Sequence, residues 1–174
     1  MKKIIVIGCP GSGKTTFAEK LHEAIGLPLI YLDAIWHRPD KTHISRDEFD
    51  ARLGEILSND AWIIDGNYSR TVERRIAAAD TVILFDLPTD VCIDGATARL
   101  GKVRPDLPWI DTSLDFNLKR EIEEFRSKHL PVLYDLLCRY GEGRSVVVFK
   151  SRGEADEFIH SIVSSKRSKC AHHN

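Results

Sequence analysis

Five short apolar runs divide most of the chain, and each is continuous rather than alternating with polar positions. They lie at residues 4–7, 29–32, 62–64, 81–85 and 146–149. They are rich in β-branched and aromatic side chains, which favour extended backbone. A continuous apolar run of this length is typical of a strand buried on both faces of a parallel sheet. The pattern therefore predicts five parallel strands.

Helical segments are predicted between these strands. The first ends at Gly26, which suits the left-handed position after a helix. Ser45 with Glu48 forms a capping box that opens a helix to about residue 58, and Ser151 with Glu154 opens the last helix towards residue 163. Alternating strands and helices predict one α/β domain over about residues 1–165, with right-handed crossovers. Ligands of such folds bind at the carboxyl ends of the strands.

The connection between the fourth and fifth strands, residues 88–144, is far longer than one crossover helix requires. Its middle is polar and shows little helical signal, so we expect residues 99–113 to form a lid over the nucleotide end of the sheet. A helix is predicted from about Asp115. Pro131 must kink or split this helix, because proline lacks the backbone donor.

Composition and charge narrow the classes of partner. The 174 residues are 43 % hydrophobic and 29 % charged, close to an average soluble protein, and the net charge is −1. A near-neutral chain has no global field for nucleic acid or a membrane, so neither is expected as a partner. With no leader before the first strand and no membrane-length apolar run, we expect a cytoplasmic protein. Residues 166–174 are expected to form a disordered basic tail, with a small anion-binding tail as the alternative.

The four cysteines lie far apart and have no zinc-like spacing, which fits a reducing compartment. Cys9 is expected to be a passive loop residue; the alternative is a redox-sensitive thiol whose pKa is lowered by a helix N-terminus.

The first strand leads into a phosphate-binding loop, G-x-x-x-x-G-K-[ST], at residues 8–15. Glycines let backbone N–H groups wrap a phosphate chain, and the following helix adds its dipole. Lys14 is expected to reach the β- and γ-phosphates of ATP, and Thr15 to ligate Mg²⁺. The expected nucleotide-binding residues of the loop are Gly8, Pro10, Gly11, Ser12, Gly13, Lys14, Thr15 and Thr16.

Acidic side chains follow three of the strands, at Asp33, Asp65 and Asp86, and we expect all three to point towards the loop. Asp65 is the candidate second Mg²⁺ ligand, because this metal needs oxygen ligands; the alternative is a turn aspartate before Gly66. Asp33 could orient or deprotonate an acceptor hydroxyl, with Trp36 stacked on a ring. The alternative is a capping aspartate with Trp36 packed in the core.

Arginines are the cations that phosphoryl transfer requires, because charge spreads over the transferring oxygens. We expect two or three to touch phosphates, and the order of candidates is Arg104, Arg99, Arg70 and Arg126. Arg99 and Arg104 flank the lid, while Arg70 is expected to face the acceptor.

The loop at residues 8–15, the stretch 62–68 and Phe85-Asp86-Leu87-Pro88 resemble the adenylate-kinase-type P-loop kinases. More narrowly, Tyr31-Leu32-Asp33, Trp36, Arg104-Pro105-Asp106 and the stretch 149–152 look like DNA topology modulation proteins. The resemblance implies a P-loop NTPase three-layer sandwich with strand order 2-3-1-4-5, helices on both faces and a short lid. It also implies an acceptor arm over about residues 33–60 and an adenine pocket near Arg152.

Two departures from the adenylate-kinase pattern bear on the acceptor. Asn67-Tyr68-Ser69 separates Asp65-Gly66 from Arg70, and Asp94-Gly95 is expected to interrupt the helix before the lid. Together, the phosphate-binding loop, the acids at the strand ends and the arginines predict an ATP-dependent kinase for a small acceptor of the nucleotide or nucleoside type. The protein is expected to be a monomer or a dimer. The alternative is an ATP-binding regulator of DNA topology without such activity.

Overall fold

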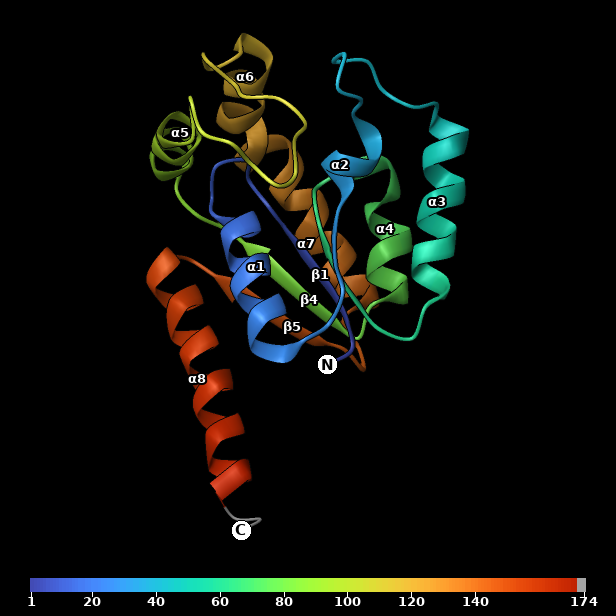
Figure 1. Cartoon of the computed structure of the whole chain (residues 1–174), viewed down its shortest axis with the longest axis vertical. Helices are drawn as coiled ribbons and strands as arrows, with labels where there is room; N and C mark the ends of the chain where they lie inside the picture. Colours follow the sequence, from blue (N-terminus) through green and yellow to red (C-terminus); the bar gives the residue numbers. More distant parts are fainter. Residues whose placement is uncertain (172–174) are drawn as a thin grey trace.

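The five apolar runs form one parallel sheet of order β2-β3-β1-β4-β5, as expected (Figure 1). The computed structural model describes the backbone of residues 1–171 and the side chains of residues 1–166. The strands are β1 (Lys3–Gly8), β2 (Leu29–Tyr31), β3 (Trp62–Asp65), β4 (Thr81–Phe85) and β5 (Ser145–Phe149). In the register, Ile5 pairs with Ile64 of β3 and Val82 of β4, so the carboxyl ends of these strands meet at one edge.

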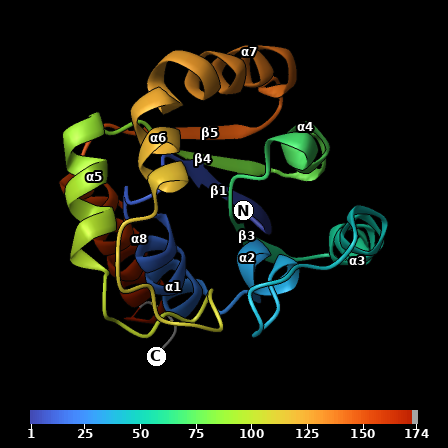
Figure 2. The ribbon, with the colours of Figure 1, turned by 90° about the horizontal axis from the view of Figure 1, so that it is seen from above.

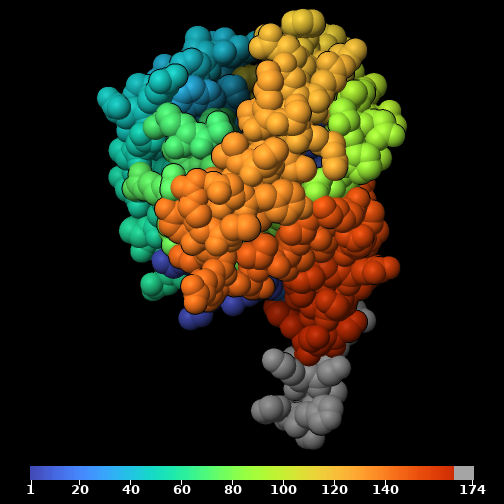
Figure 3. Space-filling view, turned by 180° about the vertical axis from the view of Figure 1, so that it is seen from behind, coloured from blue at the N-terminus to red at the C-terminus, as the bar shows by residue number. Residues whose placement is uncertain are grey.

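Helices cover both faces of the sheet (Figure 2). One face carries α1 (Lys14–Ile25) and α8 (Arg152–Ala171), and the other carries α4 (Ser69–Ala78) and α7 (Leu130–Tyr140). The arm after β2 holds α2 (Leu32–Trp36) and α3 (Arg46–Ser58), and the connection after β4 holds α5 (Thr89–Ala98), α6 (Phe116–Glu124) and the π-helical turn η1 (Phe125–His129). Seen from behind, α7 lies beside α4, and α6 continues above it towards the top of the molecule (Figure 3).

The central strand explains why the sheet is buried on both sides. Ile4, Ile5, Val6 and Ile7 are fully buried, and their neighbours on β3 and β4 are buried as well. Each buried aliphatic side chain stabilises the fold by about 1.5–3 kcal/mol relative to an exposed one. This packing holds the phosphate-binding loop at the end of β1.

Most predicted helix boundaries agree with the structure. The hydroxyl of Ser45 accepts the N–H of Glu48 at 3.1 Å, and α1 ends where Gly26 donates its N–H to the His22 carbonyl at 2.7 Å. The helix from Asp115 breaks into α6, η1 and α7, with the π-helical turn just before Pro131, as a proline inside a helix requires. Among the described helices, none combines the length and the hydropathy that a membrane crossing needs.

Two expectations were wrong. Asp33 does not end a strand, because β2 stops at Tyr31 and Asp33 lies in the short helix α2. Asp94-Gly95 does not interrupt α5. The backbone of α8 continues to Ala171, and residues 172–174 of the expected tail lie outside the described residues, so a disordered tail stays a prediction.

The close approach of Gly11 in the phosphate-binding loop to Gly95 explains why α5 contains a glycine. A Cβ on Gly95 would lie 2.1 Å from the carbonyl oxygen of Gly11, and a Cβ on Gly11 would lie 2.1 Å from the carbonyl oxygen of Cys92. The loop therefore packs directly on the α5 backbone, which only glycine permits at both positions. Gly11 also has φ +79°, in the left-handed region.

Replacing Gly11 with alanine is expected to lower the free energy of unfolding by about 4 kcal/mol or more, because strain at positive φ adds to the clash with α5. Gly26→Ala is the matched control. Gly26 has φ +76°, but nothing lies within 4 Å of its added Cβ, so only about 1 kcal/mol is expected. Urea unfolding measures both variants. Equal losses would contradict the close approach of loop and helix.

Candidate active site

The phosphate-binding loop turns from β1 into α1 at Gly13, whose φ of 105° lies in the left-handed region. The turn leaves the Lys14 side chain folded over the loop, where its ammonium donates to the carbonyl of Cys9 at 2.8 Å. Lys14 is only 8 % exposed. Burial lowers its pKa, and the nearby Asp65 carboxylate opposes that shift. A desolvated ammonium held at a loop of backbone N–H groups is suited to an anionic phosphate.

Thr15 and Asp65 are brought together, although 50 residues separate them. The Thr15 hydroxyl donates to Asp65 Oδ2 at 2.6 Å, while the other oxygen, Oδ1, is buried without a hydrogen-bond partner. Burial raises the pKa of Asp65 to about 6. A hydroxyl beside a carboxylate with a free oxygen fits Mg²⁺, which binds few protein ligands and takes the rest from phosphate and water.

The pKa of Asp65 predicts how Mg²⁺ dependence changes with pH. Below pH about 6 the carboxyl is protonated and loses its attraction for a cation. We expect Mg²⁺ with ATP to raise the melting temperature at pH 8 and to lose most of this effect at pH 5, beyond the loss seen with ATP alone. In Asp65→Asn the Mg²⁺ increment should be small at both pH values.

Without ligand, the contribution of Asp65 to the stability of the fold changes with pH in the opposite direction. Asp65 binds a proton more tightly when folded, because its pKa rises from 3.8 to about 6, so its contribution to stability falls as pH rises through that window. Unfolding curves of wild type and Asp65→Asn between pH 4 and pH 7 measure this contribution. A Mg²⁺ increment in melting temperature that stays constant from pH 8 to pH 5 would contradict the assignment of Asp65.

Two cavities meet at Lys14 and Thr15. The first, of about 490 Å³, lies between the loop, α5 and α8, and we call it the nucleotide cavity. The second, of about 670 Å³, lies between the loop, the α2 arm and α6–α7, and we call it the acceptor cavity. Five residues line both: Lys14, Thr15, Arg99, Arg104 and Asp106. The two cavities can therefore hold two molecules in contact at Lys14.

The predicted nucleotide-binding residues divide between these cavities. The nucleotide cavity is lined by Gly11, Gly13, Lys14, Thr15, Thr16 and Arg152, while Pro10 faces the acceptor cavity. Gly8 and Ser12 are buried and line neither cavity. Arg152 donates to the carbonyls of Gly11 at 3.0 Å and Val91 at 3.1 Å, so it ties the loop to α5. Its assignment to an adenine pocket stays a prediction.

The structure separates the four candidate arginines. Arg99 and Arg104 reach the junction of the cavities. Arg104 binds Asp106, which is 3 % exposed, and lies 3.5 Å from Asp111. Within the described chain the Arg99 side chain has no hydrogen bond or ion pair, and burial lowers its pKa. Arg99 is therefore the guanidinium that is free to meet a phosphate.

Arg70 and Arg126 line neither cavity, although Arg70 was expected to face the acceptor. Arg70 forms a bidentate ion pair with Asp50 of α3 at 2.6 and 2.7 Å. Arg126 donates to Asp86 at 2.9 Å. Asp86 also binds Lys150 and lines neither cavity, so it does not point towards the loop as predicted. Each of these two arginines is thus bound to an aspartate outside the cavities.

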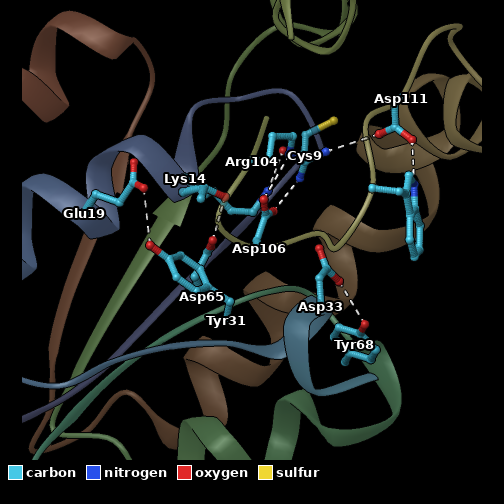
Figure 4. A network of polar contacts seen from close by, with 12 residues as sticks. Cys9, Lys14, Glu19, Tyr31, Asp33, Asp65, Tyr68, Arg104, Asp106 and Asp111 are labelled. Carbon is cyan, nitrogen blue, oxygen red and sulfur yellow. Dashed lines mark hydrogen bonds and ion pairs between the residues drawn. The ribbon is translucent and has the colours of Figure 1, made fainter. Parts of the chain in front are cut away.

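Asp33 lies in the first turn of α2 and lines the acceptor cavity. The hydroxyl of Tyr68 donates to Asp33 Oδ1 at 2.8 Å (Figure 4). Burial raises the pKa of Tyr68, and the Asp33 carboxylate raises it further, so the phenol keeps its proton and orients the acid. Trp36 both packs against the core, stacked on His43 at 4.4 Å, and lines the cavity.

Sequence reasoning missed the brace that holds this side of the site. Arg75 is fully buried and donates to the carbonyls of Gly66 at 2.7 Å, Tyr68 at 3.1 Å and Asn67. Asn67 in turn accepts the N–H of Gly8 at 3.0 Å. This brace fixes the turn after β3 and links it to the loop. No local pattern marks Arg75, which stands among other charged residues of an amphipathic helix.

Cys9 is buried against α5 rather than exposed in the loop. Its side chain neighbours Cys92, and this contact together with burial raises the pKa of Cys9. A raised pKa disfavours the reactive thiolate, so the structure agrees with the expectation of a passive loop residue.

Comparisons with known proteins are consistent with this geometry. No protein-family model matches the chain. In sequence it is similar to an adenylate kinase of Thermotoga neapolitana, 24 % identical over 131 residues that cover 57 % of this chain and 59 % of that protein. It is also similar to an adenylate kinase of Thermotoga maritima, 30 % identical over 80 residues that cover 46 % and 36 %. The chain thus matches less than two thirds of the length of these relatives.

Two solved structures share the fold. A gluconokinase from Sinorhizobium meliloti 1021 superposes with a TM-score of 0.55 at 17 % identity, covering 94 % of this chain and 90 % of that one. A shikimate kinase from Acinetobacter baumannii in complex with shikimate has a TM-score of 0.58 at 17 % identity, covering 97 % and 94 %. The chain has the P-loop kinase fold of these proteins. The narrower resemblance to DNA topology modulation proteins stays a prediction.

Proposed function

We propose that this protein is an ATP-dependent phosphotransferase that moves the γ-phosphate to a hydroxyl of a small acceptor of the nucleotide or nucleoside type. The observation that carries the proposal is the meeting of two cavities at Lys14, Thr15 and Arg99. A transferase needs both substrates in contact, whereas an ATP-binding switch needs only one site. The likeness to adenylate kinases supports the same class of reaction.

ATP would lie in the nucleotide cavity with its phosphates on the loop. Lys14 would exchange its bond to the Cys9 carbonyl for the β- and γ-phosphates. Thr15 and Asp65 would hold Mg²⁺, which supplies positive charge to the phosphates. Arg99 lines both cavities, and its side chain has no ion pair in the described chain, so it would stabilise the charge that develops on the transferring group.

The acceptor would lie in the acceptor cavity with one hydroxyl near Asp33. The hydroxyl oxygen attacks the γ-phosphorus, a new P–O bond forms, and the bond from the γ-phosphorus to the β–γ bridging oxygen breaks. ADP leaves with that electron pair, and the hydroxyl proton passes to the Asp33 carboxylate. Tyr68 keeps this carboxylate oriented, and the 99–113 segment limits water at the junction.

The proposal is tested by coupled ADP release with ATP and Mg²⁺, against nucleosides, nucleoside monophosphates, sugars and other hydroxyl metabolites. We expect one class of acceptor to raise ADP release well above the rate with water alone, and mass spectrometry to find the phosphorylated acceptor. ATP binding without stimulation by any acceptor would contradict the proposal. The regulatory alternative would then be tested by DNA binding at physiological salt.

A further inference from the structure

The positive charges of the acceptor cavity are all shared with the nucleotide cavity. Its lysine and arginine side chains are Lys14, Arg99 and Arg104, and each lines both cavities. Among the described lining residues, the part that faces only the acceptor has no lysine or arginine, and its basic side chains are His37 and His129. Burial lowers the pKa of His37, which favours its neutral form.

The acceptor cavity is instead lined by carboxylates. Five of them line this cavity and not the other: Asp33, Asp65, Asp111, Asp115 and Glu121. Asp33 accepts only the neutral Tyr68 hydroxyl, and Asp115 accepts the backbone N–H of Asn117 at 3.0 Å. The Glu121 side chain has no hydrogen bond or ion pair within the described residues, and desolvation raises its pKa. These three acids have no lysine or arginine partner there.

The three cations that line both cavities have other partners, either in the structure or in the proposed reaction. Arg104 is held by Asp106 and Asp111, and Lys14 and Arg99 line both cavities, where in the proposed reaction they would meet the transferring phosphate. A phosphate or carboxylate on the acceptor would therefore lie among Asp33, Asp115 and Glu121 without a lysine or arginine of its own. Like charges repel each other, so such an acceptor is disfavoured.

Flat aromatic side chains supply the rest of the wall. Trp36, Tyr68 and Trp109 line the cavity, and Trp109 is fixed by its indole N–H, which donates to Asp111 at 2.9 Å. The ammonium of Lys41 lies 6.0 Å from the ring centre of Trp109, within range of a cation–π contact. Aromatic faces beside free carboxylates are suited to a ring that carries hydroxyl or amino donors.

We propose that the acceptor is a hydroxyl compound without phosphate or carboxylate, either uncharged or carrying an amine. A nucleoside or an amino sugar has this chemistry, whereas a nucleotide or a sugar acid does not. The inference rests on the proposed function and narrows its acceptor. Asp33 would meet the reacting hydroxyl, and Glu121 and Asp115 would accept hydrogen bonds from the other donors.

The test compares probes that differ in charge on one skeleton: glucosamine, glucose and gluconate, and adenosine with adenosine monophosphate. ADP release measures transfer. Ligand-observed NMR measures binding of the same probes, and of a fragment set sorted by charge, to the protein saturated with a non-hydrolysable ATP analogue and Mg²⁺. We expect uncharged and cationic probes or fragments to bind and anionic ones to bind at least about tenfold more weakly.

The outcomes separate the two proposals. Transfer to a nucleotide or a sugar acid would overturn the inference while supporting the kinase. Charge-selective binding of uncharged or cationic fragments, without transfer to any probe, would support the inference about the cavity and count against kinase activity. Preferred binding of anions, or no binding by any class of probe or fragment, would overturn the inference.

Glu121→Gln isolates the charge, with Glu123→Gln as its matched control on the same helix. Glu123 lies 3.8 Å from Lys119 and lines neither cavity. Glu121→Gln is expected to weaken the binding of amine-bearing probes by about tenfold and to leave uncharged probes within about twofold. Glu123→Gln should change neither. An equal loss for charged and uncharged probes in Glu121→Gln would indicate a structural role instead.

Discussion

Lys14→Met is expected to lower kcat for acceptor-dependent ADP release by at least about 100-fold, and by up to about 10,000-fold if Lys14 stabilises the transferring phosphate alone. Its ammonium is the cation at the loop that also faces both cavities. Methionine has similar length and flexibility but no charge. The loss should therefore report charge rather than shape.

The stability of Lys14→Met is expected to differ from that of wild type by less than about 1 kcal/mol. Removing the buried ammonium removes its desolvation cost, while the attraction between Lys14 and Asp65 is lost, and these two effects oppose each other. Lys128→Met is the control, since Lys128 is exposed and lies 2.8 Å from Glu124. Urea unfolding and ADP release measure both variants. Retained activity in Lys14→Met would contradict the assignment of this lysine.

Asp33→Asn is expected to lower kcat by about 100- to 10,000-fold, because an amide cannot take the proton of the attacking hydroxyl. The KM for ATP should stay near the wild-type value, since Asp33 does not line the nucleotide cavity. Asparagine can still accept the Tyr68 hydroxyl, so the local fold should persist.

Two further variants show whether the reduced kcat of Asp33→Asn comes from the loss of its carboxylate. Tyr68→Phe removes the hydrogen bond but keeps the carboxylate, so we expect a smaller reduction of kcat, about tenfold. Asp40→Asn changes an exposed acid of the same arm that accepts from Thr42, and should leave kcat unchanged. If Asp33→Asn raised the KM for the acceptor and left kcat intact, Asp33 would bind the acceptor rather than act as a base.

The carboxyl ends of the strands show where sequence reasoning succeeded and failed. Asp65 was predicted to point towards the loop and does so, because β3 pairs with β1 and the Thr15 hydroxyl binds the carboxylate. Asp86 also follows a buried strand, yet it turns towards Arg126, Tyr134 and Lys150. The position of an acid along the chain was the same in both cases. Only the residues packed around it decided which way its side chain points.

For the arginines too, the surrounding residues decide which way the side chain points. Arg99 and Arg104 reach the junction because they flank the connection that crosses it. Arg70 was placed on the acceptor side from its spacing after Asp65, but Asp50 on the neighbouring helix binds it away from the cavity. Charged side chains are long and flexible, so their partners depend on distant segments that a motif does not record.

By itself the sequence determined the elements and the phosphate-binding loop of this protein, because both follow from local rules. Continuous apolar runs form buried parallel strands, and a glycine-rich turn between strand and helix exposes backbone N–H groups. The tertiary structure alone decided the acceptor side. The Arg75 brace, the Tyr68–Asp33 hydrogen bond and the carboxylates around the acceptor cavity join residues from separate elements. Their contacts arise only when packing brings those elements together.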